Sequence, residues 1–154
     1  MALTPEIPPY DLRAANKSPL LRDALNALTA WHAQHCLSYA NMRQRMFGTA
    51  PATCCEDLPW LPVRLFKTQD LMSCEHSSII KTLTSSGTTG QAVSRIYLDR
   101  ETSLRQTRAL TAIMTCFLGK QRMPMVIVDS AGLLKDRSRF NARTAGILGF
   151  SVFG

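Results

Sequence analysis

The chain has 154 residues, of which 45% are hydrophobic and 19% are charged, a composition that indicates a globular domain and excludes an intrinsically disordered chain. No apolar run approaches the roughly 20 residues of a membrane-spanning helix, and the N-terminus lacks the basic start and apolar core of a secretory signal, so we expect a cytoplasmic protein without a membrane span. The net charge of +7 is scattered without basic runs or interleaved aromatic residues, which argues against nucleic-acid binding and fits an anionic ligand or an acidic remainder of a larger protein.

The first predicted element is a long helix. Residues 1–17 are rich in proline and are expected to be irregular. Ser18 is a good N-cap and Pro19 suits the first helical position, so the helix is expected to start there and to run to Phe47, where Gly48 can end it. Its apolar stripe consists of Leu21, Leu25, Leu28, His32, His35, Tyr39, Met42 and Met46.

Two strands with a loop between them are predicted next. A proline-containing loop over residues 49–62 precedes a short apolar stretch and a turn that Thr68 can start. Residues 79–84 are rich in β-branched side chains and are predicted to form a strand. After the loop 85–91, residues 92–98 show a two-residue alternation that predicts a second strand.

A second long helix is predicted to follow these strands directly. Asp99 is a candidate N-cap for a helix over residues 100–118, and Gly119 can end it. The apolar run 123–128 has the pattern of a buried parallel strand.

The C-terminal part completes an α/β pattern. A helix is expected over residues 141–148 with Gly149 after it, and another strand is expected to begin within 150–153. Strands that alternate with helices predict an α/β fold with a mixed sheet and flanking helices. Residues 18–154 are expected to belong to one domain.

Cysteine and histidine offer few signs of a metal site. The five cysteines are odd in number and include no Cys-x-x-Cys pair, so reduced thiols are expected and no metal site is predicted. His32 and His35 lie within the apolar stripe beside Cys36, and core-lining side chains are the preferred interpretation. Cys74 and Cys116 are candidate acyl-accepting thiols, but a packed loop thiol at Cys74 and a buried helical thiol at Cys116 are favoured.

The segment from Leu83 to Gln91, LTSSGTTGQ, has the chemistry of a phosphate-binding loop. Glycines let the backbone turn through positive φ so that its N–H groups can surround an anion. The segment lacks the Gly-Lys-Ser/Thr ending of a Walker A loop, and a plain hairpin turn remains the alternative. The hydroxyl donors are Ser85, Ser86, Thr88 and Thr89, and the bends are Gly87 and Gly90.

A family resemblance sharpens this interpretation. Thr84-Ser85-Ser86-Gly87-Thr88-Thr89-Gly90 resembles the phosphate-loop signature of acyl-adenylate-forming ligases. The flanking segments 61–67 and 143–151 look like the acyl-protein synthetase branch, the fatty-acid-activating component of bacterial luminescence systems, whose wider relatives include phenylacetate–coenzyme A ligases. The resemblance covers roughly residues 15–154 and implies the N-terminal part of a ligase-like large domain.

The resemblance implies ATP and magnesium as cofactors and a carboxylic acid, a fatty acid in this branch, as substrate. The acid would be activated as an acyl-adenylate and passed to a thiol of an acyl-accepting protein or of coenzyme A. The phosphate site would comprise Thr84, Ser85, Ser86, Gly87, Thr88, Thr89, Gly90 and Arg95.

The chain departs from the family pattern at two points. Ala92 and Val93 stand where many members carry Pro-Lys, so Arg95 is taken as the cation. No aromatic-Gly-x-Thr-Glu segment occurs, and the catalytic residues stay unassigned. We therefore expect an N-terminal portion that is inactive alone, with a non-catalytic truncated module or a subunit of a split ligase as the alternative.

Overall fold

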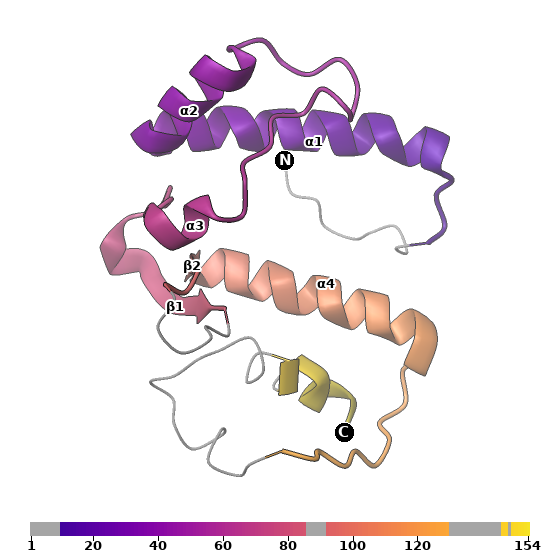
Figure 1. Cartoon of the computed structure of the whole chain (residues 1–154). Coiled ribbons are helices and arrows are strands. Elements are labelled where there is room, and N and C mark those ends of the chain that lie inside the picture. Colours follow the sequence, from indigo (N-terminus) through magenta and orange to yellow (C-terminus); the bar gives the residue numbers. More distant parts are fainter. Residues whose placement is uncertain (1–9, 86–91, 130–145, 148) are drawn as a thin grey trace.

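The computed structural model describes residues 10–85, 92–129, 146–147 and 149–154, and in this part of the chain helices flank a small sheet (Figure 1). The α/β fold class predicted from the sequence is confirmed. The elements are α1 (Ala14–His35), α2 (Leu37–Phe47), α3 (Leu65–Thr68), the 3-10 helix η1 (His76–Ser78), β1 (Ile79–Thr84), β2 (Arg95–Asp99), α4 (Arg100–Leu118) and the 3-10 helix η2 (Ser151–Phe153).

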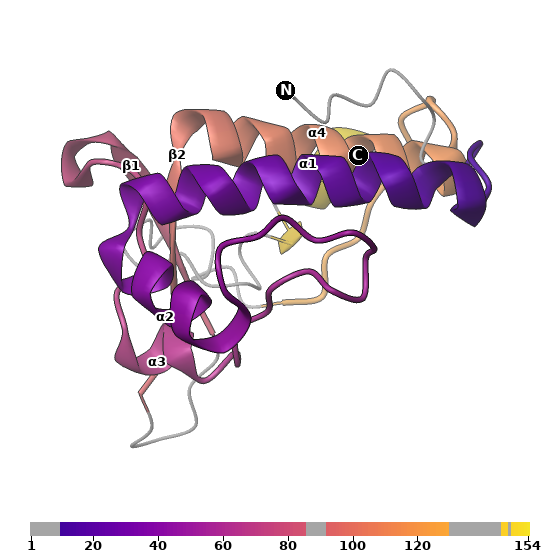
Figure 2. The ribbon, with the colours of Figure 1, turned by 90° about the horizontal axis from the view of Figure 1, so that it is seen from above.

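The two long helices run in opposite directions with roughly parallel axes, as Figures 1 and 2 both show. The sheet lies at the end where α4 begins. At the other end, the ring of Tyr10, which precedes α1, meets the ring of Phe117 edge-on with centroids 5.5 Å apart. The start of α1 is thereby tied to the end of α4.

Helix α1 begins at Ala14, so the predicted start at Ser18 is wrong. Ser18 lies within the helix, where its hydroxyl donates to the carbonyl oxygen of Ala14 at 2.9 Å. Pro19 is also inside the helix. A proline so close to a helix N-terminus removes only one backbone hydrogen bond, and the alanines before it favour one more helical turn.

The continuous helix predicted as far as Phe47 is interrupted at Cys36. This residue has extended backbone angles (φ −136°, ψ 99°) and separates α1 from α2. Its side chain is buried, at 7% exposure, so the break turns the thiol into the interior. The predicted end is confirmed, because Gly48 closes α2 with a φ of 78° that other residues rarely adopt.

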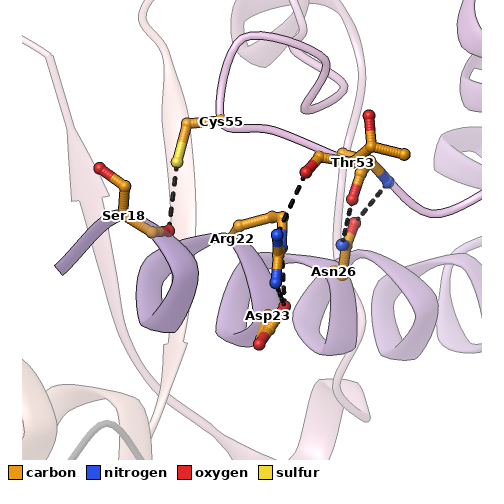
Figure 3. A network of polar contacts seen from close by, with 7 residues as sticks. Ser18, Arg22, Asp23, Asn26, Thr53 and Cys55 are labelled. Atoms are coloured by element: carbon orange, nitrogen blue, oxygen red, sulfur yellow. Dashed lines mark hydrogen bonds and ion pairs between the residues drawn. The ribbon is translucent and has the colours of Figure 1, made fainter. Parts of the chain in front are cut away.

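The predicted loop after Gly48 is fastened to α1 by polar contacts (Figure 3). The side-chain amide of Asn26 donates to the carbonyl oxygen of Ala52 and accepts from its N–H, both at 2.9 Å. Arg22 donates to the carbonyl oxygen of Thr53 at 3.1 Å, and the Cys55 thiol donates to that of Ser18 at 3.4 Å. These bonds satisfy loop backbone groups that form no regular structure.

Strands β1 and β2 pair antiparallel, which confirms the predicted strand–loop–strand unit. The first strand has the predicted bounds, whereas the second begins at Arg95 and not at Ala92. Thr84 lies opposite Arg95 and Thr82 lies opposite Tyr97. The side chain of Leu98, on β2, is 2% exposed and therefore points into the interior.

The signals at both ends of α4 are confirmed. The carboxylate of Asp99 accepts a hydrogen bond from the N–H of Thr102 at 2.7 Å, and Gly119 ends the helix with a φ of 76°. The expectation that Cys116 is buried is wrong. Its side chain is exposed, and its thiol donates to the carbonyl oxygen of Ala112 at 3.3 Å.

The buried strand predicted over residues 123–128 is absent from the described part of the chain. Val126 is 88% exposed and Val128 is 93% exposed. The N–H of Met123 donates to the carbonyl oxygen of Phe153 at 2.9 Å, but no described strand pairs with this segment. An apolar run specifies a strand only when a neighbouring strand accepts its backbone bonds.

The last predicted elements differ as well. The helix expected over 141–148 lies mostly outside the described residues, and Gly149 and Phe150 are themselves helical, so Gly149 does not end a helix. The strand expected within 150–153 is wrong, because Ser151–Phe153 is a 3-10 helix.

The described residues bury few apolar side chains: Cys36, Leu98 and Phe153. Polar contacts, more than a large core, therefore set the local geometry around the sheet.

Candidate phosphate-binding site

The two ends of the predicted phosphate loop meet at the open end of the sheet. Ser85 directly follows β1, and Ser94 directly precedes β2. The N–H of Ser85 donates to the carbonyl oxygen of Ser94 at 3.2 Å, and the N–H of Ser94 donates to the Ser85 hydroxyl at 2.9 Å. Ser94 is buried at 9% exposure. We call Thr84, Ser85, Ser94 and Arg95 the neck of the loop.

Three of the predicted site residues are thus brought together by the structure: Thr84, Ser85 and Arg95. The hydroxyl oxygen of exposed Ser85 is used as an acceptor within the neck. Its O–H hydrogen is a separate donor and is available to an anion. The other predicted residues lie outside the described part of the chain: Ser86, Gly87, Thr88, Thr89 and Gly90.

A carboxylate that the sequence does not single out also lies at this end of the sheet. Oδ1 of Asp70 is 3.0 Å from Nη2 of Arg95 and accepts the hydroxyl hydrogen bond of Tyr97 at 2.7 Å. Arg95 and Tyr97 alternate along β2 and therefore share a face of the strand. In the sequence, the sign of this site is that Arg95, a cation, and Tyr97, a phenol, occupy alternate positions of one strand.

These contacts shift the pKa values of Asp70 and Tyr97. The hydrogen bond from Tyr97, followed by the charge of Arg95, holds the pKa of the Asp70 carboxyl below its usual value. The same hydrogen bond raises the pKa of Tyr97 above its usual value of 10.0. At neutral pH Asp70 is therefore a carboxylate and Tyr97 a neutral donor.

The segment that carries Asp70 is also tied to α1. Nδ1 of His32 lies 2.7 Å from the hydroxyl oxygen of Ser73. His32 is half-buried, but the expectation that His35 lines a core is wrong, because His35 is exposed and its Nδ1 lies 2.7 Å from the carbonyl oxygen of Trp31. Among the described residues no three metal-ligating side chains converge. Each of the two histidines forms a short polar contact, His32 with Ser73 and His35 with Trp31.

The remaining sequence candidates do not join the neck. Cys74 is half-buried and Cys116 is exposed on α4, and neither thiol forms a disulfide. Lys81, on β1, is not one of these candidates; it is half-buried, and this burial lowers the pKa of its ammonium group. Throughout the described ranges, no helix has the length and apolarity needed to cross a membrane.

A hairpin neck with a serine hydroxyl and an arginine, on an α/β scaffold, has the donor chemistry that anion-binding sites use. A family model adds the identity: the model of the acyl-protein synthetase LuxE family matches residues 3–152. The chain belongs to this family, which implies fatty-acid activation, use of ATP and an acyl acceptor. Searches of curated proteins and of solved structures found no match.

Proposed function

We propose that this chain provides the nucleotide-phosphate site for ATP-dependent activation of a fatty acid. The acid would form an acyl-adenylate with loss of pyrophosphate, and the acyl group would then pass to a thiol of a carrier protein or coenzyme A with release of AMP. The observation that carries the proposal is the hydrogen-bonded neck, which holds Arg95 beside a loop rich in hydroxyls and glycines in a chain of this family.

Acyl activation brings two anions together, because a carboxylate must approach the α-phosphate of a nucleotide. Donors fixed in advance lower this barrier, since they need no reorganisation when charge shifts toward the leaving pyrophosphate. We assign this role to the loop: Ser85, Ser86, Thr88 and Thr89 donate through their hydroxyls, and Gly87 and Gly90 allow their backbone to approach the β- and γ-phosphates. Arg95 supplies the positive charge.

The donor chemistry of the neck fits a polyphosphate. Nε of Arg95 is buried and has no hydrogen-bond partner among the described residues. Nη2 lies 3.0 Å from Oδ1 of Asp70, and a guanidinium carries five N–H donors in all. Magnesium, when bound, would neutralise further phosphate charge. We assign no magnesium ligand to this chain.

The alternative is a non-catalytic module or a subunit of a split ligase. The exposed apolar segment with Val126 and Val128 favours it, because such surface is typical of a protein that packs against a partner. The missing aromatic-Gly-x-Thr-Glu segment agrees with either candidate, provided that the chain is inactive alone.

Two readouts on the same sample separate the candidates: photo-crosslinking to an azido-ATP analogue with magnesium, and pyrophosphate release with ATP and a long-chain fatty acid. We expect crosslinking within residues 84–95 that excess ATP suppresses, without pyrophosphate release. Release by the chain alone would contradict its expected incompleteness. Absence of crosslinking in the folded chain would refute the proposed site and favour the interaction module.

A further inference from the structure

We propose that Asp70 is a positioning residue, which directs the guanidinium of Arg95 toward an anion bound at the neck. The inference rests on the proposed function and adds to it a residue distant in sequence from the loop. The evidence is the contact of 3.0 Å between Nη2 of Arg95 and Oδ1 of Asp70, next to the closed neck.

Arg95 has a fixed backbone and a long side chain. It is the first residue of β2, follows Ser94 directly and lies opposite Thr84 in the sheet, so its Cα belongs to the neck. An arginine side chain has many rotamers, and ordering it on ligand binding costs free energy. A residue that holds the guanidinium in place beforehand removes part of this cost.

Asp70 is suited to this task because it is held itself. Its Oδ1 accepts the hydrogen bond of Tyr97 at 2.7 Å, and Tyr97 is fixed in the same strand as Arg95. Three residues further along, Ser73 is tied to His32 of α1. The carboxylate is thus held by Tyr97 in the sheet, and its segment is held to α1 through the contact of Ser73 with His32.

The contact leaves most of the arginine for a ligand. It joins Oδ1 of Asp70 to a single guanidinium nitrogen, Nη2, and Nε lacks any hydrogen-bond partner in the described part of the chain. The side chains of Arg95 and Asp70 are 43% and 59% exposed, and exposed ion pairs add little stability. After Tyr97 and Arg95, His76 also helps to lower the pKa of the Asp70 carboxyl.

A double-mutant cycle on the full chain tests the inference. MgATP affinity is measured by calorimetry for the wild type, Asp70→Asn, Arg95→Gln and the double variant. Glu101→Gln is the matched control, because Glu101 forms a similar exposed ion pair with Arg105 on α4. Far-ultraviolet circular dichroism confirms that each variant is folded.

We expect Asp70→Asn to weaken MgATP binding about fivefold when Arg95 is present, and not to weaken it in the Arg95→Gln background. Glu101→Gln should leave the affinity near that of the wild type. An equal effect of Asp70→Asn in both backgrounds, including an equal gain from the loss of a negative charge, would overturn the positioning role. Absence of binding by the folded wild type would refute the proposed function, and with it this inference.

Discussion

The hydroxyl oxygen of Ser85 accepts a hydrogen bond from the N–H of Ser94 at 2.9 Å, across the neck of the candidate phosphate loop. The backbone bond from Ser85 N–H to the Ser94 carbonyl oxygen, at 3.2 Å, runs in the opposite direction. Because both residues lie outside the strands, these bonds extend the closure of the hairpin beyond its sheet pairing. Ser85 therefore has a structural task in addition to any contact with a ligand.

Replacement of Ser85 by alanine should loosen this neck. The variant leaves the buried N–H of Ser94 without its side-chain acceptor, which should cost about 1 kcal/mol. Amide hydrogen exchange at Ser94 should accelerate, as measured by NMR. Ser85→Thr retains a hydroxyl and should restore protection. Unchanged exchange in Ser85→Ala would show that the backbone bond alone closes the neck.

Loss of the Asp99 N-cap of α4 should destabilise the chain more than loss of the Ser18 hydroxyl in α1. Asp99→Ala removes the acceptor of the Thr102 N–H and should destabilise the chain by about 1 kcal/mol in urea unfolding. Ser18→Ala is the matched test, because its hydroxyl bonds within α1 and caps no N-terminal N–H group. Its cost should be smaller. The opposite order would contradict the observed start of α1.

The same cap should make stability depend on pH. Hydrogen bonds from the side chain and backbone of Thr102 lower the pKa of Asp99 below its usual value of 3.8. A lowered pKa in the folded state stabilises fully above the unfolded value, and this contribution is lost as pH falls through the folded value. Asp99→Asn keeps an acceptor and should flatten the urea-unfolding profile below about pH 4. If the stability of Asp99→Asn falls with pH as steeply as that of the wild type, Asp99 is excluded as the source of this pH dependence.

Local signals predicted those parts of the fold that depend on neighbouring residues. Asp99 and Gly119 bound α4 because a cap bond and a positive φ are decided within one helical turn. The break at Cys36 has no glycine or proline to announce it, and it reflects burial of the thiol by the tertiary structure. The apolarity of the run 123–128 predicts a strand, but apolarity does not supply a pairing partner, and no described strand pairs with this run.

The candidate site likewise has a part that neighbouring residues predict and a part that they do not. The loop chemistry and Arg95 are readable because they lie in one short stretch of sequence. The contact between Asp70 and Arg95 is not readable, since it joins residues far apart in the chain.

His32 should make the chain less stable in mild acid. Burial, and then the charge of His35, lowers the pKa of His32 below its usual value of 6.5. The folded state therefore binds fewer protons, so stability is full above about pH 6.5 and falls as pH decreases below it. His32→Asn keeps a polar partner for Ser73 and should reduce the loss in urea unfolding between pH 7 and 5.5. A slope in His32→Asn equal to that of the wild type would exclude His32 as the cause.

The thiols should react in an order set by exposure and charge. Timed alkylation at pH 7.5 with mass spectrometry should modify exposed Cys116 early and buried Cys36 last. Cys54 is exposed, but hydrogen bonds with the side chains of Asp57 and then Glu56 raise its pKa, so it should react more slowly than Cys116. Early modification of Cys36 would contradict the break between α1 and α2 that buries it.

The central claim is that the loop between β1 and β2 binds nucleotide phosphates. Its most direct test is calorimetric titration of the full chain with ATP and magnesium, compared with Thr88→Ala/Thr89→Ala and with Thr107→Ala, a matched substitution on α4. The account predicts binding by the wild type and by Thr107→Ala, and a loss of at least about tenfold in the double variant, which lacks two hydroxyl donors. Binding that the double variant retains in full, or no binding by a folded wild type, would contradict it.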